Sequence, residues 1–268
     1  MTKPAFLRWA GSKKQILPEI KKYWHTDFSR YVEPFCGSAS LFFDVQPRKA
    51  LLSDINSDLV NALNAVKNAA DEVSAKLGML KTDKDSYYQI REICPNCISE
   101  QDRAVRFIYL NSLCFNGLYR VNKAGKFNVP YGSKHRKELF SAGALRETAK
   151  TLENAEIKIM DFEASVDQTA EGDFLYLDPP YATAAERVFT EYQADAFTRG
   201  DIRRLNSSLL RANERGVKFV LSYADVAEIE CFDAKWPVKR VFARRNIAGF
   251  SGSRKIISEV LITNVESI

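Results

Sequence analysis

The segment 174–181 constrains the fold more than any other part of the sequence. Its first four residues are apolar or aromatic with no polar face, and a carboxylate, two prolines and a tyrosine follow. A short apolar run of this kind predicts a strand buried on both faces, as in a parallel sheet. Proline lacks an N–H and fixes φ, so Pro179 and Pro180 end the strand. We therefore expect Asp178 at the carboxyl edge of an α/β sheet, where open sheets bind ligands.

Three neighbouring groups at this edge are suited to a flat ring that carries an exocyclic amine. The Asp178 carboxylate and the Pro179 carbonyl accept hydrogen bonds, and Tyr181 offers an aromatic face. Together they predict a site for an amino-substituted planar ring. This hypothesis requires further residues, elsewhere in the chain, that complete such a site.

Length and composition are those of a globular cytoplasmic protein with a sizeable core. The chain has 268 residues, enough for one large domain or for a domain with an insertion. Its formal charge of +5 is modest, so the distribution of charge is more informative than its sum. No run of about 18 apolar residues predicts a transmembrane helix, and the N-terminus lacks the apolar core of a signal peptide. We therefore expect a cytoplasmic location without membrane contact.

The cysteines and histidines argue against metal and nucleophile chemistry. Five cysteines, an odd number, in a chain without a secretory signal are typical of free thiols. Cys94 and Cys97 have the spacing of half a zinc site, but no second close pair completes it. His25 and His135 are the only histidines, which disfavours a Ser-His or Cys-His pair. We expect no metal centre and leave the role of Cys94 and Cys97 open.

The N-terminal segment places an aromatic and a cationic residue on either side of a small-residue turn. Trp9 and Lys13 flank Gly11 and Ser12, and a short helix is predicted at 15–24. Such a pair is suited to an aromatic, positively charged ligand that also carries a carboxylate. A basic helix start with Trp9 in the core remains the alternative.

A strand–turn–helix pattern surrounds Gly37. With one glycine it is a weak nucleotide fingerprint, and a structural turn explains Gly37 equally well. A second short strand, 50–53, ends at Asp54, where an acid is suited to a pair of ribose hydroxyls. Asp54 or Asn56 can also cap the helix that begins near Ser57, and the two roles are compatible.

A helical stretch and a basic hairpin interrupt the α/β pattern. From 57 to 114 apolar residues recur at helical spacing without strand signals, which predicts an inserted helical subdomain. Residues 116–132 have the pattern of a hairpin that turns near 123–125. No acid occurs between Gly117 and Lys137, and basic residues alternate with aromatic ones. This composition favours nucleic-acid contact over a solvated charged hairpin.

The α/β pattern resumes after Gly143. Helices are predicted at 145–152 and 201–215, and strands at 156–160, 174–177, 217–222, 238–243 and 256–263. A second acid-free loop, 244–255, is rich in basic, glycine and serine residues and is suited to phosphate contacts.

Five motifs in this order closely resemble the Dam-like enzymes, the D12 class of adenine-N6 DNA methyltransferases. They are residues 6–13, 33–40, 54, 127–132 and 178–181. Cofactor motifs come first, then a target-recognition insert, then Asp-Pro-Pro-Tyr, which is the order of the alpha group. The resemblance covers nearly the whole chain. It implies a Rossmann-like S-adenosylmethionine-dependent methyltransferase sheet from residues 1–56 and 144–268, with 57–143 as a mainly helical target-recognition domain carrying a β-hairpin.

The resemblance implies S-adenosylmethionine as the methyl donor. Trp9 and Lys13 would lie against it, Asp54 would bind its ribose hydroxyls, and the turn at 34–40 would pass beneath its methionine part. Asp161 and Phe162, which follow the strand predicted at 156–160, would hold its adenine. The implied cofactor residues are Trp9, Lys13, Pro34, Phe35, Gly37, Ser38, Ser40, Asp54, Asp161, Phe162 and Asp178.

The sequence departs from the family pattern at two small residues. The family's Phe-x-Gly-x-Gly ends here in Ala39, and Ser12 stands where a glycine usually precedes the lysine. Alanine and serine are small enough that we expect cofactor binding to be kept, at a lower affinity.

The resemblance also assigns the chemistry, to Asp178, Pro179 and Tyr181. An adenine amino nitrogen is a poor nucleophile because its lone pair is delocalised into the ring. The Asp178 carboxylate and the Pro179 carbonyl would accept hydrogen bonds from its two N–H groups and favour a pyramidal nitrogen. Positioning and pre-set dipoles would supply the rate, without a covalent enzyme intermediate or a metal. N6 lies inside the duplex, so the adenine would be flipped out and Tyr181 would stack on it.

The hairpin matches positions that contact the bases of GATC in Dam-like enzymes, so GATC or a close relative is the favoured target. Arg120 is suited to a bidentate contact with guanine O6 and N7. Leu118 and Pro130 would contact thymine methyl groups, and Phe115 matches an aromatic that wedges into the duplex. The implied DNA contacts are Phe115, Asn116, Leu118, Arg120, Lys126, Pro130, Lys134, Arg136, Lys137, Arg245 and Arg254.

Two other functional classes stay open. An RNA or protein amino-methyltransferase shares the Pro-Pro-aromatic logic, although Asp178 and the basic hairpin favour DNA adenine. A DNA-binding regulator with a vestigial cofactor site is disfavoured by the intact Trp9, Lys13 and Asp54. We expect a prokaryotic or phage-encoded enzyme that binds double-stranded DNA as a monomer and is nucleoid-associated through that binding. A cognate restriction endonuclease is left open.

Overall fold

The computed structural model describes residues 6–9, 13–122, 124–132, 140–181, 197–246 and 254–266. The strands are β1 (Arg30–Glu33), β2 (Ala50–Asp54), β3 (Ala155–Ile159), β4 (Asp173–Leu177), β5 (Lys218–Ala224), β6 (Val238–Asn246) and β7 (Arg254–Thr263). They form a seven-stranded sheet in the order β3-β2-β1-β4-β5-β7-β6. β1 to β5 run parallel, and β7 runs antiparallel to both β5 and β6. The predicted mostly parallel α/β sheet is therefore confirmed.

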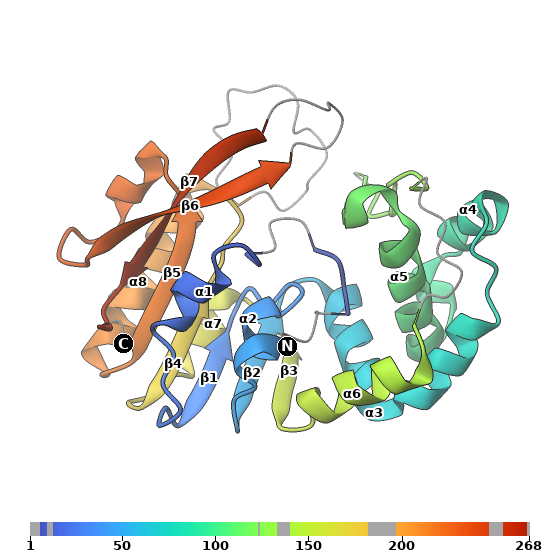
Figure 1. Cartoon of the computed structure of the whole chain (residues 1–268), viewed down its shortest axis with the longest axis horizontal. Coiled ribbons are helices and arrows are strands. Elements are labelled where there is room, and N and C mark those ends of the chain that lie inside the picture. The colour runs from blue at the N-terminus through green and yellow to red at the C-terminus, as the bar shows by residue number, and fades with distance from the viewer. Residues whose placement is uncertain are drawn as a thin grey trace.

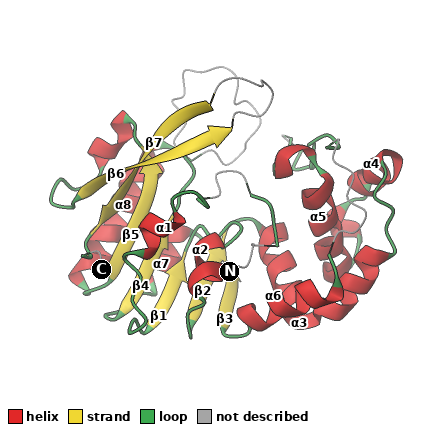
Figure 2. Ribbon diagram, in the orientation of Figure 1, coloured by secondary structure: helices red, strands yellow, loops and turns green. Residues whose placement is uncertain are grey.

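Helices cover both faces of this sheet. They are α1 (Leu17–Lys21), α2 (Ser40–Val45), α3 (Ser57–Gly78), α4 (Lys84–Glu92), α5 (Glu100–Leu113), α6 (Ala142–Leu152), α7 (Phe162–Asp167) and α8 (Arg199–Glu214), with short 3₁₀ helices η1 (Pro95–Cys97), η2 (Phe115–Gly117) and η3 (Ala227–Cys231). One core joins the sheet to α1, α2 and α3, and a second joins it to α7 and α8. Figures 1 and 2 show α3 to α6 grouped beside the sheet, with the β6–β7 ribbon rising on the other side.

The central strand β4 is the one that the sequence singled out. It pairs with β1 on one side and β5 on the other, and all five of its residues are buried. Phe174 and Tyr176 enter one core, whereas Leu175 and Leu177 enter the other. This alternation explains why the strand is apolar on both faces, and it places Asp178 at the carboxyl edge of the sheet.

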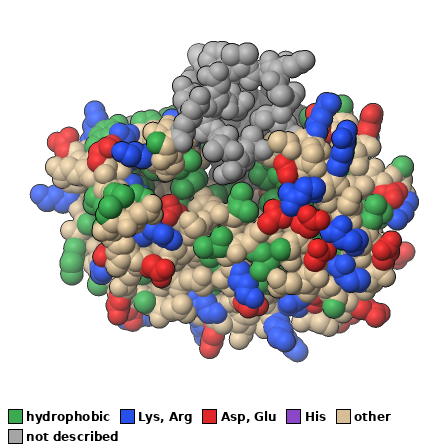
Figure 3. Space-filling view, turned by 180° about the vertical axis from the view of Figure 1, so that it is seen from behind, with side chains coloured by type: hydrophobic (Ala, Val, Ile, Leu, Met, Phe, Trp, Pro, Cys, Tyr) green, Lys and Arg blue, Asp and Glu red, His purple; other side chains and the backbone are tan. Residues whose placement is uncertain are grey.

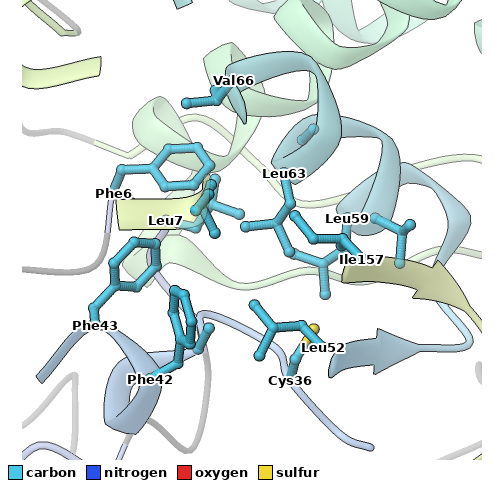
Figure 4. Close-up of a cluster of buried hydrophobic side chains, with 14 of the residues drawn as sticks. Phe6, Leu7, Cys36, Phe42, Phe43, Leu52, Leu59, Leu63, Val66 and Ile157 are labelled. Atoms are coloured by element: carbon cyan, nitrogen blue, oxygen red, sulfur yellow. The ribbon is translucent and has the colours of Figure 1, made fainter. Parts of the chain in front are cut away.

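The helix α3 shares its core with the sheet. Figure 4 shows Phe42 of α2, Leu52 of β2 and Leu63 of α3 among the side chains of one buried cluster. Asn56 caps this helix, because its side chain accepts a hydrogen bond from the Leu59 amide. Of the two caps considered from the sequence, Asn56 is thus the one that the structure uses.

Two element boundaries differ from the sequence prediction. The helix predicted at 15–24 is regular only over Leu17–Lys21, since Pro18 lies in its first turn and Tyr23 and Trp24 are buried in turns after it. The helix α7 was not predicted at all. Asp161, expected as a cofactor residue, accepts a hydrogen bond from the Glu163 amide and caps α7.

The predicted hairpin is present in an irregular form. Its described part pairs through two isolated antiparallel bridges, Cys114 with Tyr131 and Val121 with Phe127, and contains no regular strand. Its base is tied to the helical region by the Tyr131 hydroxyl, which donates to the Thr82 carbonyl at 2.8 Å. Glycine and asparagine, which are disfavoured in strands, interrupt the segment and explain the lack of a regular strand in its described part.

Two surface properties bear on the partners of the protein. Over the described residues, no helix combines the length and the apolarity needed to cross a membrane. On the coloured part of the face in Figure 3, Lys and Arg side chains are interspersed with Asp and Glu side chains rather than gathered in one patch.

Candidate active site

The carboxyl edge of the sheet brings together residues from three distant parts of the chain. The Lys13 ammonium lies 3.3 Å from Asp178 Oδ1 and 2.8 Å from Glu259 Oε2. The same ammonium donates to the Tyr181 hydroxyl at 2.6 Å. Burial lowers the pKa of Lys13, but the neighbouring acidic groups, Asp178 first, outweigh it and raise that pKa above its usual value. Lys13 is therefore a permanent cation at the centre of the site.

The Asp178 carboxylate is held in place but not closed off. Its Oδ1 accepts a hydrogen bond from Ser222 Oγ at 3.0 Å, and its side chain is 23% exposed. Burial raises the pKa of Asp178 to about 6; Lys13 and Ser222 oppose this rise and the charge of Glu259 adds to it. Asp178 is thus ionised at neutral pH and remains accessible to a ligand.

Tyr181 and the two prolines complete this wall. The Tyr181 ring packs edge-on against Tyr223, with 5.5 Å between the ring centroids. The Lys13 ammonium lies 4.9 Å from the centroid of the Tyr181 ring. Pro179 is buried and Pro180 is exposed. The three residues predicted to act in catalysis, Asp178, Pro179 and Tyr181, therefore lie together at the edge.

The turn after β1 forms a second part of the site with Asp54. The Gly37 amide donates to Asp54 Oδ2 at 3.1 Å, and the Asn56 amide donates to Oδ1 at 3.0 Å. Burial raises the pKa of Asp54. Gly37 has a φ of 46°, and a Cβ there would lie 2.8 Å from Trp9 Cδ1. Only glycine therefore allows the turn to approach both the carboxylate and the indole.

The departure from the family pattern at Ala39 has a structural cost. Ala39 is left-handed, with φ 50° and ψ 41°, at the start of α2. An L-residue with a Cβ is strained in that conformation by about 1 kcal/mol. Ser38, which is buried, and Ser40 lie on either side, with their hydroxyls 2.9 Å apart. The small residues of this turn thus belong to its packing.

Trp9 links the Gly37 turn to the hairpin. Its ring stacks on Tyr119, with 5.7 Å between centroids and 19° between planes. The backbone beside it is fixed by Asn111 of α5, which accepts from the Arg8 amide at 2.9 Å and donates to the Arg8 carbonyl at 2.7 Å. The predicted cofactor residue Trp9 therefore touches both the Gly37 turn and the hairpin.

Asp161 and Phe162 lie near the turn but are occupied by packing. Phe162 is buried and stacks on Phe35, with 5.3 Å between centroids. The Arg204 guanidinium lies 4.7 Å from the Phe162 centroid and 2.8 Å from Asp161 Oδ1. These contacts give both residues a structural role at the start of α7.

Two exposed apolar residues at the same edge were missed from the sequence. Ile55 follows Asp54 and is 61% exposed; Ile159 ends β3 and is 59% exposed. Asp54 pairs with Ile159 in the sheet register and Ile55 follows it in the chain, so both isoleucines are backbone neighbours of Asp54. The available signal was an isoleucine directly after an acid that ends a strand.

Glu33 and Glu259 were also missed. Glu33 is buried, accepts from the Tyr31 hydroxyl at 2.9 Å, and has a pKa that burial raises well above its usual value. Glu259 is a lone acid in an otherwise apolar strand segment, a pattern that marks a buried charge with a partner. Nothing in the sequence identified that partner as Lys13.

The residues predicted to contact DNA lie mostly on the exposed side of the hairpin. Phe115 is 45% and Leu118 is 37% exposed, and Arg120 Nε donates to Asn128 Oδ1 at 2.7 Å. The other exposed members are Asn116, Lys126 and Pro130. Lys134, Arg136 and Lys137 lie outside the described residues. Arg245 and Arg254 lie at the far end of the β6–β7 ribbon, where Arg245 pairs with Lys255 and Arg254 with Asn246.

The thiols of Cys94 and Cys97 are exposed and free. Within the described ranges, no three His, Cys, Asp or Glu residues are grouped so that they could hold a metal ion.

Comparison with known proteins identifies the family. A family model described as D12 class N6 adenine-specific DNA methyltransferase matches residues 9–244. The chain belongs to this class. The "Type II methyltransferase M1.LlaDCHI" of Lactococcus lactis subsp. cremoris is 32% identical over 97% of this chain and 94% of that protein. The "DNA adenine methylase" of Escherichia coli (strain K12) is 33% identical over 96% and 94%.

A viral relative shows the same region within a longer protein. The "DNA N-6-adenine-methyltransferase" of Escherichia phage P1 is 30% identical over 96% of this chain, which corresponds to 35% of the phage protein. The chain is thus an adenine-specific DNA methyltransferase, and the resemblance read from its motifs is confirmed.

Proposed function

We propose that this methyltransferase transfers a methyl group from S-adenosylmethionine to N6 of an adenine flipped out of duplex DNA. GATC or a close relative is the favoured target. The observation that carries the proposal is the Asp178 carboxylate. It is ionised at neutral pH, fixed by Lys13 and Ser222, and 23% exposed beside Pro179 and Tyr181.

The residues around Asp54 fit S-adenosylmethionine. The Asp54 oxygens accept backbone N–H groups, among them those of Gly37 and Asn56, and their remaining lone pairs can accept ribose hydroxyls. Ile55 and Ile159 offer exposed apolar surface for an adenine ring. Gly37 leaves room for close approach to the backbone. When bound, this cofactor supplies a methyl group activated by the positive charge of its sulfonium.

The chain's own residues prepare the adenine amine. Asp178 Oδ and the Pro179 carbonyl accept hydrogen bonds from its two N–H groups, which favours a nitrogen with a localised lone pair. N6 loses one of these protons during or after methyl transfer. Tyr181 stacks on the flipped ring and excludes water from one face. These groups act by orientation and pre-set charge, and both effects are strongest in a partly buried site.

The residues 57–143 serve as the target-recognition domain in this proposal. Arg120 reads a guanine in the major groove, and a hydrogen bond from its Nε to Asn128 Oδ1 restrains the guanidinium. Phe115 and Leu118 are large apolar residues exposed on the same segment, which suits contact with bases. The basic residues around the hairpin and the β6–β7 ribbon contact phosphates.

The deciding experiment is sequencing of methylated adenines in duplex DNA treated with the purified protein and S-adenosylmethionine. We expect methylation of one adenine within one short sequence, GATC or a close variant. Methylation found only in RNA or protein would exclude DNA adenine as the substrate. DNA binding without calorimetric binding of S-adenosylmethionine would indicate a regulator.

A further inference from the structure

Glu259 is part of the site but has no role in the chemistry proposed above. It lies in the middle of β7, opposite Ala224 of β5 and Val241 of β6, and is 4% exposed. The two residues after it, Val260 and Leu261, are fully buried. A carboxylate in such surroundings is costly unless a cation pairs with it.

The cation that pairs with Glu259 is Lys13. Its ammonium is closer to Glu259 Oε2, at 2.8 Å, than to Asp178 Oδ1, at 3.3 Å. Among the described residues, Oε2 has no hydrogen bond beyond this ion-pair contact. The lysine is therefore shared between two carboxylates, one directly after β4 and the other in β7.

This sharing matters because the Asp178 carboxylate has to accept a hydrogen bond from the substrate amine. A buried ammonium bound tightly to Asp178 would compete for the same oxygen. One cation between two carboxylates leaves one negative charge in excess. The site can therefore give the ammonium to one carboxylate and keep the other free.

We propose that Glu259 is a positioning residue: it holds the Lys13 ammonium away from Asp178 and so leaves the Asp178 carboxylate available to the adenine amine. The inference rests on the role of Asp178 in the proposed function. Glu259 acts through Lys13 and does not touch the substrate.

A pH signature distinguishes this role from simple packing. The groups that act on Asp178 are Lys13, Ser222 of β5 and Glu259 of β7, and Asp178 in turn affects Glu33 of β1. Further groups at the site are Tyr176 of β4 and Tyr181. Glu259 raises the pKa of Asp178, whereas Lys13 lowers it. Without the Glu259 charge the ammonium moves to Asp178, so the pKa of Asp178 falls while its oxygen becomes less available.

The test compares Glu259→Gln with the wild type in single-turnover methyl transfer at a series of pH values around 6. We expect the rate at neutral pH to fall about tenfold and the acid limb of the pH–rate profile, where the rate drops as the pH falls, to move to lower pH. The dissociation constants of DNA and S-adenosylmethionine should stay unchanged. Glu259→Asp should restore part of the rate and bring the acid limb of the pH–rate profile back to its wild-type position. Glu19→Gln is the matched control, since it removes an exposed ion pair with Lys239 of β6 at 2.9 Å.

A double-mutant cycle with Lys13→Met tests whether Glu259 acts through the lysine. If it does, adding Glu259→Gln to Lys13→Met causes no further loss of rate. The melting temperature gives a readout independent of activity: Lys13→Met should melt lower than the double variant, because it leaves two buried carboxylates without a cation and the double variant leaves one. This comparison holds even if Glu259→Gln is too unstable to assay, since the double variant remains testable.

Three outcomes would overturn the inference: an unchanged rate and limb in Glu259→Gln, a lower rate with an unmoved limb, or additive losses in the cycle. They are separable from failure of the proposed function. If Asp178→Ala is inactive while Glu259→Gln behaves as wild type, only the role of Glu259 fails. If Asp178→Ala keeps its turnover, the role of Asp178 fails and that of Glu259 with it.

Discussion

The carboxyl edge around Asp178 and the hairpin around Arg120 are built in opposite ways. At the edge, the contacts join residues far apart in the chain, such as Lys13 with Tyr181 and Ser222 with Asp178. At the hairpin tip, the contacts are local, as between Arg120 and Asn128. Changes at the tip can therefore leave the edge intact, whereas a change at the edge disturbs several strands. In the proposed function, the sheet therefore fixes the residues of the chemistry, and the residues of target recognition lie on a segment that can change independently.

The largest expected effect is at the edge. Asp178→Ala removes the charged acceptor of the amine and should lower the methyl-transfer rate by about three orders of magnitude, comparable to the loss of a pre-set stabilising group in other enzymes. DNA affinity, measured by fluorescence anisotropy, should stay within about twofold because Asp178 lies outside the hairpin. Turnover within about tenfold of wild type would refute the assigned role.

A change in the cofactor part of the edge should separate binding from chemistry. Asp54→Ala removes a charged acceptor and should weaken S-adenosylmethionine binding by about 1.5–3 kcal/mol, or roughly tenfold to 150-fold, in calorimetry. DNA affinity should not change. Asp44→Ala on α2, which removes an ion pair with Lys21, is the control and should leave cofactor affinity unaltered. Equal weakening in both variants would mean a general loss of stability.

At the hairpin, Arg120→Ala should change preference and not chemistry. Loss of a bidentate guanine contact should reduce discrimination at one base pair by about 1–3 kcal/mol. Methylation rates on a library of single-base variants of the target measure this effect. Asn128→Ala, which frees the guanidinium without removing it, should relax the same base pair by less. A uniform loss over all sequences would indicate that Arg120 contacts a phosphate.

The pH dependence of the wild type reports on the edge alone. Asp178 acts as an ionised acceptor and has a pKa raised to about 6, so activity should be lost as the pH falls through about 6. One unit below that value only about a tenth of the enzyme is ionised, so kcat/KM, which follows the free enzyme, should be about tenfold lower. The Arg120→Ala variant should keep the same limb. If the acid limb of the pH–rate profile moves in the Arg120→Ala variant, the edge and the hairpin do not act independently.

The smallest effect concerns charge around the hairpin. Replacing Lys134, Arg136 and Lys137 by alanine should reduce the slope of log affinity against log salt by up to about 2.7, since each phosphate contact contributes about 0.9. The control is a triple alanine variant of three exposed basic residues at the opposite edge of the sheet, Arg48, Lys49 and Lys218. An equal slope in the two triple variants would remove residues 134–137 from the interface.

The contrast between the regions also explains what the sequence could predict. The position of Asp178 was predictable because an apolar run followed by two prolines is a local signal. The partnership of Lys13 with Glu259 was not, because it depends on the register of β7 against β5 and on where the N-terminal segment packs. α7 was overlooked because Asp161 was interpreted through the family resemblance and not as a helix cap. The hairpin was predicted by composition, while its two isolated bridges depend on contacts with α4 and α5.

The stack of Trp9 on Tyr119 has a thermodynamic consequence. One indole touches the Gly37 turn and the base of the hairpin at once. A ligand that shifts Trp9 at Gly37 also alters the support of Tyr119, and DNA that shifts Tyr119 acts back on Gly37. Linkage requires these effects to be equal: whatever factor cofactor binding imposes on DNA affinity, DNA binding imposes on cofactor affinity. The order in which the two ligands arrive is therefore free to vary, but the free energy of the ternary complex is the same by either route.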